Sequence, residues 1–332
     1  MNTRIMDVTL RDGSYEVNFK FTKDDVRFVG DAIKNSGIEY FEIGHGQGLN
    51  ASSEKNGIAA CTDREYLETA SEYLSGLKYG TFCIPGIARL EDLDLLSTYG
   101  ASFVRIGCNT DEESVKKTKP FIQRAKNLGL EVYANYMKTY VADSEEFIRC
   151  VRLSEEYGAD TLVIVDSAGC MLPEDIKKYY DLIRDNSKKN VQIGFHGHDN
   201  LGLSVSNSLY ALQIGCDIVD TSLQSLGRGA GNASTEQLIA ILLRLAPECH
   251  YKLGPLMHFS EDYLREMVKF KGVSGLDTYC GIAGFHSGYM NSIRKAAKEY
   301  NLDPYDLIVE YCKIDRKYLD EELLTRIAIK MK

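Results

Sequence analysis

The feature that most constrains the fold is an alternation, repeated eight times along the first three quarters of the chain, of a short apolar, β-branched run and a longer stretch with helical periodicity. This alternation is typical of βα units whose strands form one parallel sheet. We expect strands at residues 5–10, 40–43, 79–84, 103–106, 131–135, 161–165, 192–196 and 218–221. The clearest helices are expected at 22–35, 63–74, 113–127, 143–157 and 173–184, several of them opened by Thr, Asp or Ser as N-cap.

Eight such units favour a closed (β/α)8 barrel, a TIM barrel, over an open doubly wound sheet, which is the alternative architecture. Glycines that follow the expected strands support closure, because the backbone must turn sharply there. In barrels of this kind the chemistry sits at the C-terminal ends of the strands. Candidate site residues should therefore lie directly after the strands.

The pattern changes after Pro247. From there the chain shows helical segments at 258–270, 287–300, 304–311 and 320–330, with no strand between them. We therefore expect two domains, a catalytic barrel over residues 1–246 and a C-terminal helical domain over residues 247–332.

Charge and composition narrow the classes of function. A net charge of −9 opposes binding to nucleic acid, which requires a basic face. No run approaches the ~18 apolar residues that cross a bilayer, and the first residues lack the apolar core of a signal peptide. Nine scattered cysteines without a C-x-x-C pair indicate neither a disulfide framework nor a zinc knuckle. We expect a cytoplasmic protein that acts on a small molecule, with no membrane partner.

Two histidines end the seventh expected strand. His196 and His198 are two residues apart, so on a strand their side chains project to the same side and can reach one ion. Alone, the pair is equally consistent with two hydrogen-bonded structural histidines. Asp12 follows the first strand at the same predicted mouth and favours a metal site, because one carboxylate and two imidazoles suit Mn, Mg, Co or Zn. Arg11 beside it can stabilise an enolate oxygen, although alone it would be a surface or salt-bridge arginine.

Three motifs occur in order along the chain: T-L-R-D-G at 9–13, H-x-H-x-N at 196–200 and G-R-G-A-G-N-A-S-T-E at 227–236. They resemble the family of metal-dependent lyases and synthases that contains 3-hydroxy-3-methylglutaryl-CoA lyase and isopropylmalate synthase. Within it, the chain looks most like the branch of 4-hydroxy-2-oxovalerate aldolases. Further similar runs lie at 42–49, 85–87, 165–169 and 280–287.

The resemblance implies a role for each of several residues. By its motifs, the metal ligands are Asp12, His196 and His198, and the metal is usually Mn in the aldolases. Arg11 would stabilise a pyruvate enolate, and Ser167 would contact the pyruvate moiety of the substrate.

Two asparagines are left open. Asn232 matches a further metal ligand of the CoA lyases, but it is at least as consistent with a turn residue between two small neighbours. Asn200 either orients His198 or caps the following helix.

Two positions depart from the aldolase pattern. Tyr15 stands where the aldolases have a histidine base, and His286 stands where they have a tyrosine. We hypothesise that both flank the substrate hydroxyl, with His286 as the general base and Tyr15 as the hydrogen-bonding partner, because an imidazole pKa of about 6.5 suits proton transfer at neutral pH and a phenol pKa of about 10 does not. The alternative is that the two lie far apart and the exchange marks another reaction. His45, after the second strand, is a further candidate for substrate binding in the pocket.

The predicted activity is that of a class II pyruvate aldolase, which uses a divalent metal to cleave or form a 4-hydroxy-2-oxo acid from pyruvate and an aldehyde. One alternative is a Claisen-type acyl-CoA condensing enzyme or CoA lyase of the same family. The loop at 227–232 argues against this alternative, because its sequence is closer to the aldolase pattern. The other is a non-catalytic partner subunit. The resemblance also implies an acylating aldehyde dehydrogenase as partner, and we expect a homo-oligomer.

Overall fold

The computed structural model describes residues 3–188, 190–267 and 280–332. A closed barrel of eight parallel strands forms its centre, with each strand hydrogen-bonded to the next and β8 to β1. Closure confirms the predicted barrel and excludes the open doubly wound sheet. The strands are β1 (Arg4–Asp7), β2 (Tyr40–Glu42), β3 (Lys78–Cys83), β4 (Phe103–Asn109), β5 (Glu131–Met137), β6 (Thr161–Asp166), β7 (Gln192–Gly197) and β8 (Ile218–Thr221).

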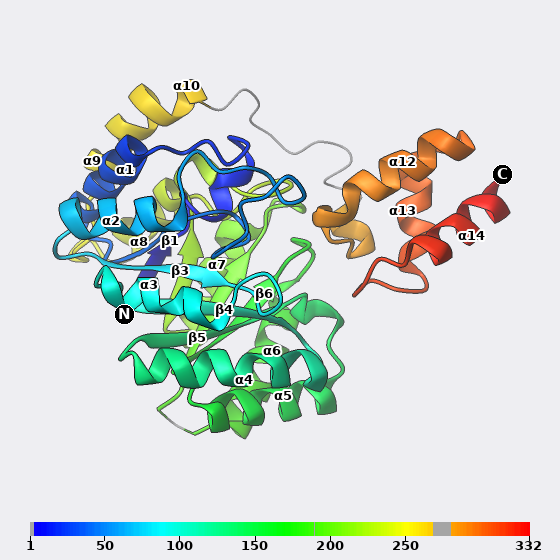
Figure 1. The fold of residues 1–332 in the computed structure, drawn as a ribbon, viewed down its shortest axis with the longest axis horizontal. Coiled ribbons are helices and arrows are strands. Elements are labelled where there is room, and N and C mark those ends of the chain that lie inside the picture. Colours follow the sequence, from blue (N-terminus) through cyan, green and yellow to red (C-terminus); the bar gives the residue numbers. More distant parts are fainter. Residues whose placement is uncertain (1–2, 189, 268–279) are drawn as a thin grey trace.

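Helices surround the barrel and alternate with its strands (Figure 1). Their starts follow from capping side chains: Thr22 and Asp25 form a capping box at α1, and Asp143 accepts backbone hydrogen bonds at the start of α5. These helices are α1 (Lys23–Asn35), α2 (Asp63–Tyr73), α3 (Leu93–Thr98), α4 (Glu112–Asn127), α5 (Ser144–Tyr157), α6 (Pro173–Asn186), α7 (Ser204–Ile214) and α8 (Thr235–Leu245).

Successive strand residues divide between two apolar clusters. In β6, Val163 and Val165 belong to a small cluster that also contains Met6, while Leu162 and Ile164 belong to the large cluster shared with the helices. This division follows from the alternation of side chains on a strand. The small cluster fills the barrel interior with apolar side chains. Polar side chains from different strands therefore meet near the strand ends.

The C-terminal part contains two groups of helices. The first, α9 (Gly254–Phe259), the π-helix η5 (Ser260–Leu264) and α10 (Arg265–Met267), contributes Leu256 and Leu264 to the large barrel cluster. The expected helix at 258–270 overlaps this group, but its residues 268–270 lie outside the described residues.

The second group has an apolar core of its own, built from Cys280 to Ala328. Figure 1 shows its helices beside the barrel in orange and red. They are the 3-10 turn η6 (Ser287–Tyr289), α12 (Met290–Tyr300), α13 (Pro304–Cys312) and α14 (Glu321–Met331), at the positions expected for the last three helices. The division of the chain at residue 246 stays a prediction. Within the described ranges, no helix is both long and apolar enough to cross a membrane.

Candidate active site

A cavity of about 320 Å³ opens where the strands end, and most of the residues predicted from the sequence line it. It is bordered by side chains that follow β1, β5, β6 and β7 and by a segment from the C-terminal helical group. The predicted residues that line the cavity are Arg11, Asp12, Tyr15, Ser167, His196, His198 and His286.

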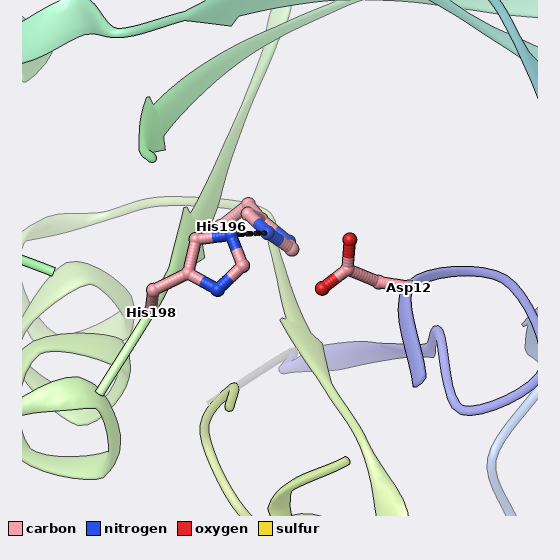
Figure 2. A group of neighbouring side chains, drawn as sticks. All are labelled: Asp12, His196 and His198. Carbon is pink, nitrogen blue, oxygen red and sulfur yellow. Dashed lines mark hydrogen bonds between the residues drawn. The ribbon is translucent and has the colours of Figure 1, made fainter. Parts of the chain in front are cut away.

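Asp12, His196 and His198 come together at the cavity floor. One potential ligand atom from each lies within 4.8 Å of the others, and all three side chains are buried. Figure 2 shows the Asp12 carboxylate facing the two imidazoles. The Nε2 atoms of His196 and His198 are 3.4 Å apart. One carboxylate oxygen and two imidazole nitrogens at this separation form a donor set that fits a divalent cation.

Hydrogen bonds on the other ring nitrogens assign the tautomers of both histidines. The Nδ1 atom of His196 lies 2.9 Å from Asp220 Oδ2, and Nδ1 of His198 lies 3.2 Å from the carbonyl oxygen of Gly231. Since both partners are acceptors, each Nδ1 carries the proton and each Nε2 presents a lone pair. Burial lowers the pKa of His198 to about 3, which keeps its ring neutral. Two lone pairs that face each other in a buried site are stabilised by a cation between them, so the residues fit the metal.

Arg11 holds Asp12 in its charged form. Its Nη1 donates to Asp12 Oδ1 at 2.7 Å, and its Nε donates to Glu42 Oε2 at 2.8 Å. Although burial opposes ionisation, Arg11 and the neighbouring imidazoles hold the pKa of Asp12 well below its ordinary value. The guanidinium also lies 4.8 Å from the ring centre of Phe82, which fixes its plane. Arg11 is thereby a rigid cation beside the candidate metal ligands.

A buried ion-pair chain connects Arg11 with His196 behind the cavity. The fully buried Arg105 donates to Glu42 Oε2 at 3.1 Å and makes a second hydrogen bond to Asp220, which in turn bonds His196. Sequence reasoning missed this chain. Its signal was a charged residue directly after two apolar or aromatic residues at the start of β2, β4 and β8.

Tyr15 and His286 line the same cavity. Tyr15 packs its ring on the Cα of Gly46, where an added Cβ would lie 2.4 Å from the ring. The guanidinium carbon of Arg228 lies 4.8 Å from the centre of that ring, and Arg228 also lies against Gly288, two residues after His286. Arg228 therefore contacts both the Tyr15 side and the His286 side of the cavity.

The His286 ring is buried and held on one side. Its Nδ1 accepts a hydrogen bond from the backbone N–H of Gly288 at 3.1 Å. Burial, with the nearby charges of Arg228 and Lys138, lowers the pKa of His286 well below its ordinary value. The ring is therefore neutral at physiological pH, with the Nδ1 lone pair engaged and its proton on Nε2.

His45 does not line the cavity. Its Nδ1 accepts from the backbone N–H of Gln47, its Nε2 bonds the carbonyl of Gly57, and its ring stacks on Phe19 at 4.0 Å. Asn232 donates through Nδ2 to Leu226 O, while its buried Oδ1 has no partner among the described residues.

Sequence reasoning also missed several polar residues that line the cavity. Lys138 directly follows β5, and Tyr289 follows His286 by three positions. Asn109 and Asn135 each have a buried side-chain oxygen without a hydrogen-bond partner among the described residues. Their location at the ends of β4 and β5 was the available signal, since strand ends form the mouth of the barrel.

A closed (β/α)8 barrel whose mouth carries a cluster suited to a cation places the protein among the barrel enzymes. The sequence profile of the HMGL-like family matches residues 2–262. The chain belongs to the HMGL-like family.

Named relatives match nearly the whole chain. The 4-hydroxy-2-oxovalerate aldolase of Carboxydothermus hydrogenoformans is 32% identical over 99% of this chain and 97% of its own length. The protein of the same name from Chloroflexus aurantiacus is 34% identical over 99% of this chain and 95% of its own. The solved structure of the HMG-CoA lyase of Bacillus subtilis matches with a TM-score of 0.68 at 21% identity, over 83% of this chain and 96% of that one, and supports the fold alone.

Proposed function

We propose that the protein is a divalent-metal-dependent class II pyruvate aldolase, a carbon–carbon lyase that joins pyruvate and an aldehyde to a 4-hydroxy-2-oxo acid or cleaves it again. The observation that carries the proposal is the convergence of Asp12, His196 and His198 beside the rigid cation Arg11. Relatives named for this reaction over the full length of the chain support it. When bound, a divalent ion at these three side chains would act as a Lewis acid toward the oxygens of the 2-oxo acid.

Arg11 and Ser167 bind and orient pyruvate. Arg11 uses Nε and Nη1 for Glu42 and Asp12, which leaves its Nη2 for the oxygen that becomes negative in the enolate. Ser167 follows β6, and its Oγ accepts from the backbone N–H of Lys138 at 3.0 Å, so its own hydroxyl proton is free to meet a substrate oxygen.

The bond-forming step balances without a further reagent. Carbon 3 of the pyruvate enolate attacks the carbonyl carbon of the aldehyde, and the aldehyde oxygen takes up one proton to become the 4-hydroxyl group. In the reverse direction that proton leaves first, the bond between carbons 3 and 4 breaks, and the enolate is protonated.

His286 moves that proton, and Tyr15 hydrogen-bonds to the same substrate oxygen. To accept a proton at Nε2, the neutral ring must first carry its own proton on Nδ1, which releases the hydrogen bond from Gly288 N at a cost of about 1 kcal/mol. Burial raises the pKa of Tyr15, so the phenol stays protonated and acts as a hydrogen-bond donor.

The test separates enolisation from carbon–carbon chemistry. The metal-loaded protein should exchange the methyl protons of pyruvate with D₂O and should form 4-hydroxy-2-oxo acids with a series of aldehydes, detected by mass spectrometry. Asp12→Asn should lose both activities together with its bound metal, because one ligand and its charge are removed. The absence of exchange and of product with Mn, Mg, Co and Zn refutes the proposal, and thiol release from acetyl-CoA would instead identify a Claisen-type enzyme.

We further propose Mn²⁺ as the metal, the cytoplasm as location, a homo-oligomer as assembly and an acylating aldehyde dehydrogenase as partner. The oxygen and nitrogen donor set without thiolates is compatible with Mn²⁺. Metal analysis of the purified protein tests the choice of Mn²⁺, and co-purification with such a dehydrogenase tests the proposed partner.

A further inference from the structure

The cavity contains two cations that the proposed reaction does not use. Lys138 is buried at the end of β5, and Arg228 extends from the loop after β8. Neither forms an ion pair with an Asp or Glu among the described residues. A buried cation without a carboxylate is costly, because its desolvation is uncompensated.

Lys138 is held by neutral groups instead of by an acid. Its Nζ donates to Tyr289 Oη at 2.6 Å and to the carbonyl oxygen of Lys317 at 2.6 Å, which leaves one of three N–H donors unused. The acids nearest to it are engaged elsewhere. Asp111 pairs with Lys317 at 3.2 Å, and Asp315 accepts from backbone N–H groups. Burial, together with Arg228 and Lys317, lowers the pKa of Lys138 to about 8, so it is still charged at neutral pH.

Arg228 likewise has donors to spare. Its guanidinium stacks on Tyr15, an interaction that uses the face of the group and leaves its N–H donors in the plane free. Its buried Nε has no hydrogen-bond partner among the described residues. Unpaired polar atoms that face a cavity point to a ligand that satisfies them.

The charges elsewhere in the site balance without Lys138 and Arg228. The ion-pair chain contains three carboxylates and two guanidinium groups, a net charge of one negative unit: Asp12, Glu42, Asp220, Arg11 and Arg105. A divalent ion and the carboxylate of one pyruvate bring this region to neutrality. The positive charges of Lys138 and Arg228 are then left for the second substrate.

We propose that the aldehyde accepted by this protein carries an anionic group, a phosphate or a carboxylate, which binds between Lys138 and Arg228. The inference rests on the proposed aldolase function and specifies its second substrate. The two positive charges match a phosphate monoester in full and a carboxylate in part. By contrast, a small neutral aldehyde would leave the buried Lys138 and the half-buried Arg228 without an anionic partner among the described residues.

The experiment compares aldehydes that differ mainly in charge. Aldol addition of pyruvate is measured with glyceraldehyde 3-phosphate against glyceraldehyde, and with succinic semialdehyde against butanal. We expect kcat/KM to be at least about tenfold higher for the charged member of one or both pairs, and the pair that shows the preference identifies the anion. Equal values in both pairs overturn the inference.

Two variants assign the preference to its residues. Lys138→Met and Arg228→Met should each lower the preference, which is the ratio of kcat/KM for the charged aldehyde to kcat/KM for the neutral one, about tenfold. Lys20→Met is the control, because it removes an exposed lysine from the loop after β1 at the same end of the barrel. If both variants lower the rates with charged and neutral aldehydes equally, the inference fails.

Two further readouts keep this failure distinct from failure of the aldolase proposal. Deuterium exchange into pyruvate needs no aldehyde. Exchange without any preference for charged aldehydes therefore supports the aldolase proposal and refutes the anion site. Loss of exchange and of all aldol products refutes both proposals. Without turnover, the anion that matches the preferred aldehyde, inorganic phosphate or acetate, should raise the Tm of the metal-free wild type relative to chloride at equal ionic strength, and should not do so in either variant. The same rise in the variants, or none in the wild type, contradicts the inference.

Discussion

The neutral, buried imidazole of His286 is the residue on which the proposed proton transfer depends. His286→Ala should lower retro-aldol turnover about 100-fold or more, because it removes the neutral imidazole that is proposed to take the proton of the 4-hydroxyl group. Metal content, measured by plasma mass spectrometry, should equal that of the wild type, since the proposed ligands are Asp12, His196 and His198. His250→Ala, an exposed histidine, is the control. Undiminished turnover of His286→Ala would refute the assignment.

A second residue, Asp7 on β1, couples stability to pH. Burial raises the pKa of its carboxyl from 3.8 to about 7 in the folded protein, despite hydrogen bonds from Thr9 and Thr235. The folded state therefore binds a proton that the unfolded state has lost, so this stabilisation is complete below pH 3.8 and disappears as pH rises to about 7.

Asp7→Asn should consequently be more stable than the wild type at pH 8, by on the order of 2–4 kcal/mol, and no more stable at pH 4. Urea unfolding at the two pH values measures the difference. Asp31→Asn, an exposed carboxylate on α1, should show no such dependence. A gain for Asp7→Asn that is equal at both pH values would mean that charge burial is not its cause.

At the level of single residues, the sequence was sufficient to predict site residues that belong to a recognisable motif. It predicted that Asp12 lies near the two histidines, because the C-terminal ends of the strands share one mouth of the barrel. It did not single out Lys138 or Arg228, because a lysine after a strand and an arginine in a glycine-rich loop are ordinary surface residues until the surrounding carboxylates are known. Their unpaired state is a property of the folded environment.

The strands and their register produce the ion-pair chain behind the site. Glu42, Arg105 and Asp220 lie on β2, β4 and β8, and they meet only because the barrel closes. The sequence predicted all eight strands from short apolar, β-branched runs that alternate with stretches of helical periodicity. It could not pair these three charges, since partners far apart along the chain depend on closure and register, which local periodicity does not encode.

Asp220→Asn tests whether this chain positions His196. The Asp220 carboxylate accepts from His196 Nδ1 at 2.9 Å, and Arg105 holds the pKa of Asp220 below its ordinary value despite burial. The neutral amide should weaken metal binding about 10- to 100-fold, because the imidazole loses its orienting anion and some basicity. Competition with a chelating dye gives the metal Kd. Asp217→Asn, at the opposite end of β8, is the matched control, and equal metal affinity in both variants would contradict a positioning role.

On the scale of the whole molecule, the candidate site is complete only when the C-terminal helical group packs against the barrel mouth. The candidate metal ligands come from the barrel, whereas His286 and Tyr289 come from the segment before α12. Tyr318 joins the two parts, because its hydroxyl donates to Asp111 Oδ2 at 2.8 Å and accepts from Asn109 Nδ2 at 3.2 Å. The helical group that contains the proposed proton-transfer residue is thus held at the end of β4.

Tyr318→Ala should therefore impair catalysis without affecting the metal. With these two hydrogen bonds lost, His286 is held less firmly over the cavity, and we expect kcat/KM to fall about tenfold while metal content stays at the wild-type level. Hydrogen exchange measured by mass spectrometry should increase at residues 286–289 and stay constant in β7, which carries His196. Ile329→Ala removes an exposed apolar side chain from the same helical group and should change neither quantity. Unchanged exchange at 286–289 in Tyr318→Ala would show that the contacts of Lys138 and Lys317 alone fix this segment.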